Sequence, residues 1–250
     1  MRYIIITGAA RGLGKAFAEN LSKKETTLFL IDKRDLSETK KACEKKGAAV
    51  FDSLLDLTKT EEITPLFDTI FSKIDTDTAS TLDLINNAAA VLPLGLMGLP
   101  QNNEIDYEIT TDFTAYVLTT NEFIRRTQER NVTKRIINIS SGAAVKTIKG
   151  AAVYCGCKAA VDMFTKTVGK EQSKKEHPIH IVSVTPGVID TEMQVDLRSA
   201  PKDAFPPKNQ FAAMKKLGVL QPAESTAQKI CSLYERKKFP SGEVLSYRNI

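Results

Sequence analysis

Short apolar runs rich in β-branched residues alternate with longer segments of helical periodicity along the whole chain. Strands are predicted at 2–7, 26–32, 48–54, 81–86, 134–140, 179–185 and 243–247. Helices are predicted at 12–24, 35–46, 59–74, 104–130, 151–175 and 222–237. Strands that are joined by helical crossovers pair in parallel, and helices then cover both faces of the sheet. The alternation therefore predicts an α/β fold, a doubly wound parallel sheet of about seven strands, in a single domain over residues 1–250.

The first connection from a strand to a helix is rich in glycine. It reads Thr7-Gly8-Ala9-Ala10-Arg11-Gly12-Leu13-Gly14, with a β-branched run before it and a helical pattern after it. Glycines at such a turn let the backbone approach a pyrophosphate, whose charge is stabilised by the free N–H groups of the helix N-terminus. The alternative is a glycine-rich turn that binds nothing, and the strand–turn–helix context makes the dinucleotide site the better interpretation.

A second pattern has the composition of a proton-transfer site. Lys158 follows Tyr154 by four residues, about one helical turn, so both side chains project from one face. A neighbouring cation favours the phenolate and lowers the pKa of a tyrosine. Ser141 closes the apolar run 135–141, and ligands of an open α/β sheet bind at the carboxyl ends of its strands. Tyr154, Lys158 and Ser141 are therefore the candidate catalytic residues.

Composition argues against several classes of function. The net charge of +5 is mild, and its lysines are spread over predicted helices, so no nucleic-acid partner is expected. The apolar stretch 88–100 is too short for a bilayer and is broken by proline and glycine, so no membrane partner is expected. No targeting segment is visible, and the four cysteines show neither disulfide nor zinc spacing. We expect a cytoplasmic protein without a catalytic metal.

Taken together, these motifs resemble those of the classical short-chain dehydrogenases/reductases, over essentially all 250 residues. Within that family the chain is most similar to the sepiapterin-reductase-like carbonyl reductases, especially the bacterial benzil reductases, through 136–143, 186–194 and 239–244. The family motifs occur in order as Thr7 to Gly14, Asp56, Asn86-Asn87-Ala88, Ser141, Tyr154, Lys158, and Pro186-Gly187 with Thr191.

The resemblance implies a Rossmann fold with strand order 3-2-1-4-5-6-7 and an NAD(P)H-dependent carbonyl reductase. Its substrate would be a ketone or an aromatic α-diketone such as benzil, with (S)-benzoin as product. Tyr154 would protonate the substrate oxygen, Ser141 would orient that oxygen, and Lys158 would lower the pKa of Tyr154 and contact the nicotinamide ribose. A homo-oligomer formed through helices 104–130 and 151–175 is compatible with the resemblance.

Residues around the second strand bear on the choice of cofactor. Asp32 can accept hydrogen bonds from an adenosine ribose and would repel a 2′-phosphate, which favours NAD. Arg11, Lys33 and Arg34 are placed to attract that phosphate, and the family uses basic residues at the first two positions for NADP. Lys33 and Arg34 can equally be solvated turn residues. We favour NADP(H), with NAD(H) as the alternative.

Other cofactor contacts are implied by the same motifs. Asp56 would contact the adenine, and Thr191 would form a hydrogen bond with the nicotinamide carboxamide. Either residue can instead be a helix cap. Asn87 would tie the fourth strand to the glycine-rich turn. The remaining expected cofactor residues are Gly8, Gly12, Leu13, Gly14, Pro186, Gly187 and Val188. The segment 187–221 is predicted to be irregular, with a substrate lid at about 190–220.

Two positions depart from the family pattern. Asp112 stands where the family places an Asn that orients a water of the proton relay, and an acid there would draw the charge of Lys158 away from Tyr154. Ala89 replaces a glycine after Asn86-Asn87-Ala88. Asp112 is the fourth candidate catalytic residue, and a plain surface acid is its alternative. These departures keep two other functions open: a 3-oxoacyl or sugar-alcohol reductase of the same family, and a dinucleotide-binding sensor with weak catalysis.

Overall fold

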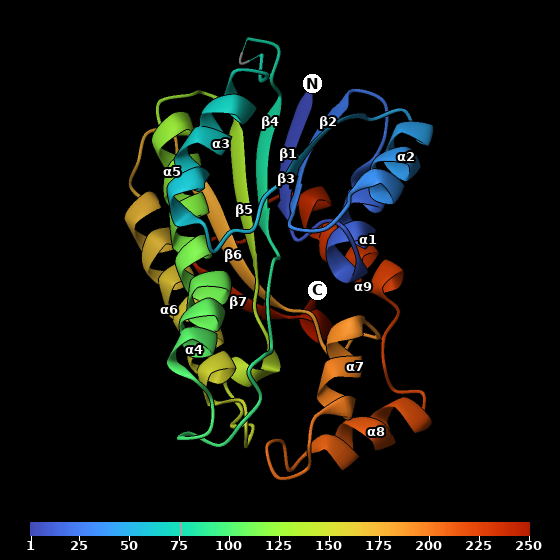
Figure 1. Ribbon diagram of the computed structural model, residues 1–250. Helices are drawn as coiled ribbons and strands as arrows, with labels where there is room; N and C mark the ends of the chain where they lie inside the picture. Colours follow the sequence, from blue (N-terminus) through green and yellow to red (C-terminus); the bar gives the residue numbers. More distant parts are fainter. Residues whose placement is uncertain (76) are drawn as a thin grey trace.

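One parallel sheet of seven strands runs through the molecule (Figure 1). A computed structural model describes residues 1–75 and 77–250 of the chain. The strand order is β3-β2-β1-β4-β5-β6-β7, which confirms the predicted order and the α/β fold. The strands are β1 (Arg2–Thr7), β2 (Thr26–Asp32), β3 (Ala49–Leu54), β4 (Thr81–Asn86), β5 (Thr133–Ile139), β6 (Ile179–Thr185) and β7 (Glu243–Ser246).

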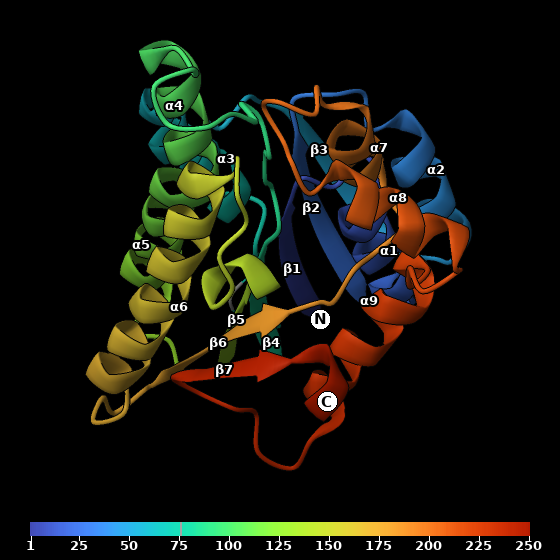
Figure 2. The ribbon, with the colours of Figure 1, turned by 90° about the horizontal axis from the view of Figure 1, so that it is seen from below.

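Helices cover both faces of this sheet, so it lies between two apolar cores. Figures 1 and 2 show α1, α2 and α9 on one face and α3, α5 and α6 on the other. All seven residues of β2 are buried, as expected for a strand that is covered on both sides. The helices are α1 (Gly12–Leu21), α2 (Ser37–Lys45), α3 (Ile63–Phe71), α4 (Asn102–Ile109), α5 (Ala115–Thr127), α6 (Ala152–Gln172), α7 (Glu192–Ser199), α8 (Lys208–Lys216) and α9 (Ala223–Cys231).

Two segments differ from the prediction. The predicted helix 104–130 is a succession of α4, a π-helical turn at Thr110–Thr114 and α5, and the turn places Asp112 in the interior. The segment 187–221, predicted to be irregular, contains the helices α7 and α8. Its three prolines lie between these helices or at the start of α8, where proline is tolerated, and Phe205 is fully buried against Phe211.

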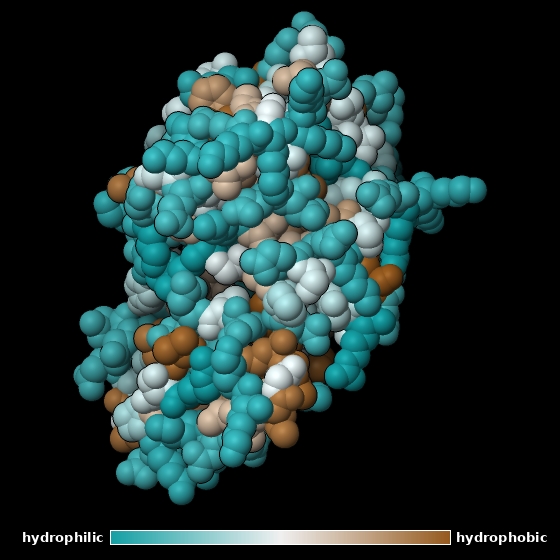
Figure 3. Space-filling view, turned by 90° about the vertical axis from the view of Figure 1, so that its right-hand side faces the viewer, coloured by the Kyte–Doolittle hydropathy of each residue, from teal (hydrophilic) through white to brown (hydrophobic). Residues whose placement is uncertain are grey.

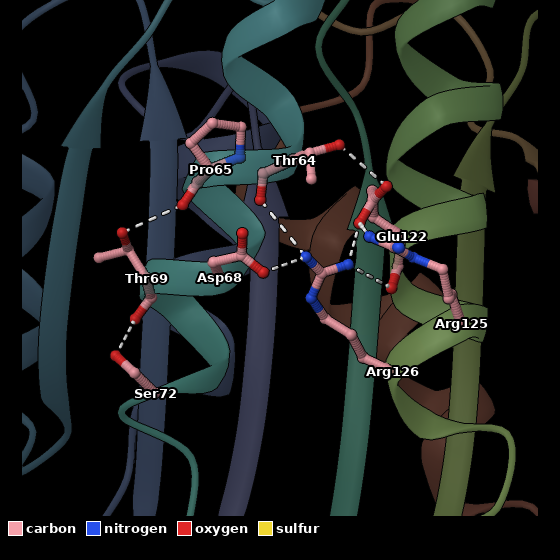
Figure 4. Close-up of polar contacts among 8 residues, drawn as sticks. All are labelled: Thr64, Pro65, Asp68, Thr69, Ser72, Glu122, Arg125 and Arg126. Atoms are coloured by element: carbon pink, nitrogen blue, oxygen red, sulfur yellow. Dashed lines mark hydrogen bonds and ion pairs between the residues drawn. The ribbon is translucent and has the colours of Figure 1, made fainter.

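An ion-pair network joins α3 to α5 on one face of the sheet (Figure 4). Its centre is the Glu122 carboxylate, which is nearly buried and accepts hydrogen bonds from Thr64 Oγ1 at 3.0 Å and from Arg125 and Arg126. Arg126 reaches Asp68 on α3 as well. Because its side chain is only 13% exposed, Arg126 is shielded from the solvent that weakens surface ion pairs.

Replacing Arg126 by Ala is expected to lower the free energy of unfolding by about 1–2 kcal/mol, because it leaves a nearly buried carboxylate with fewer donors. The matched control is Arg125→Ala, whose side chain is 59% exposed and whose loss should cost less than about 0.5 kcal/mol. Urea unfolding of both variants measures the difference, and equal losses would show that burial of this network adds no stability.

Candidate active site

Ser141, Tyr154 and Lys158 are brought together at the carboxyl end of β5. Ser141 lies two residues beyond β5 and begins a 3-10 turn at Gly142–Ala144, where its Oγ accepts a hydrogen bond from the Ala143 N–H at 3.2 Å. Tyr154 lies in the first turn of α6, and Lys158 follows one turn later. The Lys158 Nζ lies 5.5 Å from the centroid of the Tyr154 ring. The predicted pairing of the phenol with the ammonium group is therefore present in the structure.

The predicted effect on the acidity of Tyr154 is only partly correct. Burial raises the pKa of Tyr154 above its usual value, whereas Lys158 and hydrogen bonding with Ser141 act in the lowering direction. Asp112 and Glu108 add to the increase in the pKa through their negative charge. Burial outweighs the cation because the phenolate would lose its hydration. Tyr154 thus keeps its proton at neutral pH.

Asp112 lies beside Lys158, deep in the interior, and is no surface acid. Its side chain is fully buried, with Oδ2 3.3 Å from the Lys158 Nζ and Oδ1 accepting a hydrogen bond from the Ala90 N–H at 2.6 Å. Burial lowers the pKa of Lys158, whereas Asp112 and the phenols of Tyr116 and Tyr154 raise it. The increase is larger than the decrease, so the pKa of Lys158 is above its usual value. The lysine therefore stays charged, and its ammonium group acts on both the Asp112 carboxyl group and the Tyr154 phenol, lowering the pKa of each against the effect of burial.

Two further polar side chains near this site could not be identified from the sequence. Tyr116 donates a hydrogen bond to the Ile139 carbonyl at 3.2 Å, and its ring centroid lies 4.9 Å from the Lys158 Nζ. Glu108 precedes Asp112 by one helical turn and is only 1% exposed. The four-residue spacing of Glu108 and Asp112 can be seen in the sequence and indicates that they share a helix face. Their burial cannot be seen there, because it depends on how α4 packs against α6.

The glycine-rich turn packs tightly against the residues that follow β4. Gly8 and Gly12 adopt φ values of +67° and +53°, a region that favours glycine. A Cβ on Gly14 would lie 1.9 Å from the Gly8 carbonyl oxygen. The Asn87 side-chain amide donates to the carbonyls of Thr7 and Gly8, both at 3.1 Å, so Asn87 ties β4 to the turn as predicted.

Asp32 ends β2 with its carboxylate held by backbone donors. Its oxygens accept hydrogen bonds from the Ala10 N–H at 2.9 Å and the Arg34 N–H at 3.0 Å. Three cations near Asp32 each form an ion pair with an acid. The Arg34 Nη1 lies 3.8 Å from the Asp32 Oδ1. The Arg11 Nε lies 3.5 Å from the Glu192 Oε2, and the Lys33 Nζ lies 3.7 Å from the Asp56 Oδ2. Lys33 also contacts the Tyr107 hydroxyl. Lys33, whose side chain is 40% exposed, therefore contacts both Asp56 and Tyr107.

The other predicted cofactor residues also follow the carboxyl ends of strands, at the same end of the sheet as the glycine-rich turn. Asp56 lies just beyond β3 and accepts hydrogen bonds from the Thr58 N–H and hydroxyl at 3.1 and 3.0 Å, which fixes its orientation. Thr191 is the N-cap residue of α7, but its side chain makes no capping hydrogen bond to that helix. A cleft of about 590 Å³ lies between α1 and the segment with α7 and α8; both Gly12 and Thr191 line it. The loop with Pro186, Gly187 and Val188 leads from β6 to Thr191.

The walls around Tyr154 come from three separate loops. Tyr154 belongs to an apolar cluster with Val91 after β4 and with Leu197 and Phe205 of the segment 190–220. Leu94, Ile148 and Met193 are partly buried against the same cluster. The expected lid segment is thus in contact with the residues around the phenol.

These residues fit a nicotinamide dinucleotide. The first turn of α1 carries no acidic residue, and the N–H groups at the N-terminus of a helix favour a pyrophosphate. Asp32 and Asp56 lie at the ends of the next two strands, where a ribose and an adenine would be bound. Thr191 and Lys158 lie on the side toward Tyr154, where the nicotinamide end would be held.

Within residues 1–75 and 77–250, no helix is long and apolar enough to cross a membrane. The same residues contain no group of three or more His, Cys, Asp or Glu side chains arranged to hold a metal ion.

Known proteins resemble the chain over most of its length. Residues 2–202 match a family model described as short chain dehydrogenase. A benzil reductase ((S)-benzoin forming) of Bacillus cereus is 38% identical over 98% of both chains, and the sepiapterin reductase of Mus musculus is 27% identical over 95% of this chain and 93% of its own. A solved short chain dehydrogenase/reductase from Saccharomyces cerevisiae superposes with a TM-score of 0.84, covering 99% of this chain and 96% of its own at 22% identity.

Proposed function

Since the chain belongs to the short chain dehydrogenase family, we propose that it is a carbonyl reductase in which Tyr154 is the proton donor and an aromatic α-diketone such as benzil is the substrate. It is an oxidoreductase similar to the benzil reductases, and the family binds NAD(P). The observation that carries the proposal is the buried Tyr154 phenol, with the Lys158 ammonium group 5.5 Å from its ring and Ser141 beside it.

The three side chains divide the work of protonating a ketone oxygen. When bound, the reduced nicotinamide supplies the hydride that the carbonyl carbon takes up. Tyr154 gives its phenolic proton to the oxygen, and Lys158 stabilises the negative charge that develops on the phenol. The Ser141 Oγ accepts the Ala143 N–H, and its own O–H, which lies against the Tyr154 oxygen, can donate to a substrate oxygen that binds between the two side chains. Water is kept from the phenol by the apolar cluster that contains it.

The surroundings of the site support an apolar substrate. Leu92, Leu96, Met97 and Leu99 follow β4 with 36–62% of their surface exposed, and Val145 of the neighbouring loop is 82% exposed. Figure 3 shows hydrophobic side chains gathered at the end of the molecule where α7 and α8 lie. Two phenyl rings can bury such side chains, whereas a sugar could not repay the loss of its hydration there. We propose that 190–220 closes over this substrate as a lid.

The test is NAD(P)H oxidation by the purified protein with benzil, a 3-oxoacyl thioester and a keto sugar, each assayed with both cofactors. We expect benzil to have the highest kcat/KM and benzoin to be formed. Preference for the thioester or the sugar would replace the proposed substrate by one of the alternatives. Binding of the cofactor without turnover of any carbonyl would favour the dinucleotide-binding sensor.

We favour NADP(H) as the cofactor, because Arg11, Lys33 and Arg34 all lie around the end of β2. Asp32 opposes this preference, since its carboxylate would face the 2′-phosphate. Replacing Asp32 by Ser keeps an acceptor for the Ala10 N–H but removes the negative charge. The variant is expected to raise the ratio of kcat/KM for NADPH to that for NADH by at least about tenfold, or about 1.4 kcal/mol.

The control for this prediction is Asp52→Ser, which removes a carboxylate from the neighbouring strand β3, where it pairs with Lys40 at 2.7 Å. We expect this control to leave the ratio of the two cofactors unchanged. A ratio that stays at the wild-type value in Asp32→Ser would show that Asp32 does not face the 2′ position.

A further inference from the structure

Glu108 is a buried carboxyl group whose role the reduction mechanism above leaves open. It lies on α4, 1% exposed, and both of its oxygens are buried without a hydrogen-bond partner among the described residues. An ionised carboxylate in that situation would lose its hydration without any compensation, whereas the neutral acid loses much less. The position of Glu108 therefore demands that it hold a proton.

The neighbours of Glu108 explain which carboxyl group is protonated. Asp112 lies one helical turn further on. Burial raises the pKa of Asp112 as well, but Lys158 at 3.3 Å and the Ala90 N–H at 2.6 Å act against that increase and favour its charged form. Among residues 1–75 and 77–250, neither an ion-pair partner nor a hydrogen-bond donor lies against the Glu108 carboxyl group. Because two carboxylates buried side by side cannot both ionise easily, the proton goes to the member that lacks donors.

We propose that Glu108 and Asp112 form a buried carboxyl pair that holds one proton, on Glu108, and that this proton controls how strongly Lys158 acts on Tyr154. Glu108 is thus a positioning residue that acts through Lys158, and its effect on turnover rests on the proposed function. With Glu108 neutral, Lys158 faces one negative charge, that of Asp112. When Glu108 ionises, a second negative charge holds the ammonium group more strongly and makes Tyr154 a weaker acid.

The titratable groups around Glu108 support this coupling. Burial and the charge of Asp112 raise the pKa of Glu108, whereas Lys158 lowers it. The net effect is an increase to about 8. From α6, Tyr154 and Cys157 both have their pKa values raised by the charge of Glu108. As the pH rises through about 8, we therefore expect the negative charge of the pair to increase from one to two.

The first test compares the pH profiles of kcat for wild type and Glu108→Gln, which has nearly the same shape and is always neutral. Wild type is expected to lose activity as the pH rises through about 8, whereas the variant should stay active to higher pH with an unchanged KM for the cofactor. The control Asp106→Asn removes an exposed carboxylate from the same helix and should follow wild type. Coincident profiles of wild type and Glu108→Gln would overturn the proposal.

The second test does not depend on turnover. The pKa of a buried carboxyl group can be higher in the folded protein than in the unfolded chain. Such a group contributes its full stability at pH values below its unfolded-state pKa, and the contribution is lost as the pH rises through its folded-state pKa. The Tm of wild type should therefore fall relative to that of Glu108→Gln between about pH 4.5 and 8. Parallel Tm curves would overturn the proposal. If no carbonyl is reduced at all, the proposed function fails, and diverging Tm curves still support the carboxyl pair.

Discussion

Replacing Tyr154 by Phe is expected to lower kcat for carbonyl reduction by about 10²–10⁴-fold, the usual contribution of a positioned proton donor. The variant removes one oxygen and keeps the ring, which packs in the apolar cluster with Leu197 and Phe205. Its Kd for NAD(P)H should change little, because the turn at 8–14, Asp32 and Thr191 are untouched. Steady-state kinetics and cofactor fluorescence measure the two quantities separately.

Tyr116→Phe is the matched control for this variant. It removes the same atom from a second buried tyrosine, which lies 4.9 Å from the Lys158 Nζ and donates to the Ile139 carbonyl. We expect a loss of less than about tenfold in kcat, since only a hydrogen bond worth about 1 kcal/mol is removed. If kcat falls more in Tyr116→Phe than in Tyr154→Phe, Tyr116 and not Tyr154 is the proton donor, and the assignment is wrong.

Replacing Gly14 by Ala is expected to disrupt the cofactor site as a whole. The new Cβ would lie 1.9 Å from the Gly8 carbonyl oxygen and 2.6 Å from the Asn87 Nδ2, so the backbone of the turn must move. We expect the free energy of unfolding to fall by about 1–3 kcal/mol. The Kd for NAD(P)H should rise by at least about 100-fold, or about 2.8 kcal/mol.

Gly156→Ala is the control for this prediction, because Gly156 is exposed on α6, and its added Cβ would meet no atom of the described residues within 4 Å apart from its chain neighbours and the backbone of its own helix. Alanine within a helix is expected to raise stability by about 0.5–1 kcal/mol. Calorimetric titration with NAD(P)H and urea unfolding test both variants, and wild-type affinity in Gly14→Ala would mean that the turn is not the pyrophosphate site.

The strands could be predicted well, because residues buried on both faces form unbroken apolar runs. The bounds predicted for β1, β2, β4 and β6 agree with the structure. The order of the strands followed from the family resemblance. The helices α7 and α8 were missed because the prolines near them are typical of loops, while packing of Phe205 on Phe211 is a contact that no local pattern shows.

The chemistry of the site could be predicted less completely than its members. Spacing alone indicated that Tyr154 and Lys158 share a helix face, and the structure places them together. The net pKa of Tyr154 could not be derived, since burial is a property of the whole fold and here it outweighs the cation. The burial of Glu108 and the contact of Lys33 with Tyr107, 74 residues away, depend on tertiary packing in the same way.

The central claim, that Tyr154 delivers the proton to the substrate oxygen, is tested most directly in a single turnover. Wild type and Tyr154→Phe, each in excess over NAD(P)H at pH 7 so that the cofactor is fully bound, are mixed with excess benzil, and the loss of cofactor absorbance is followed in a stopped-flow instrument. The wild-type rate should exceed that of the variant by at least about 100-fold. Equal rates in two proteins that bind the cofactor equally well would contradict the account.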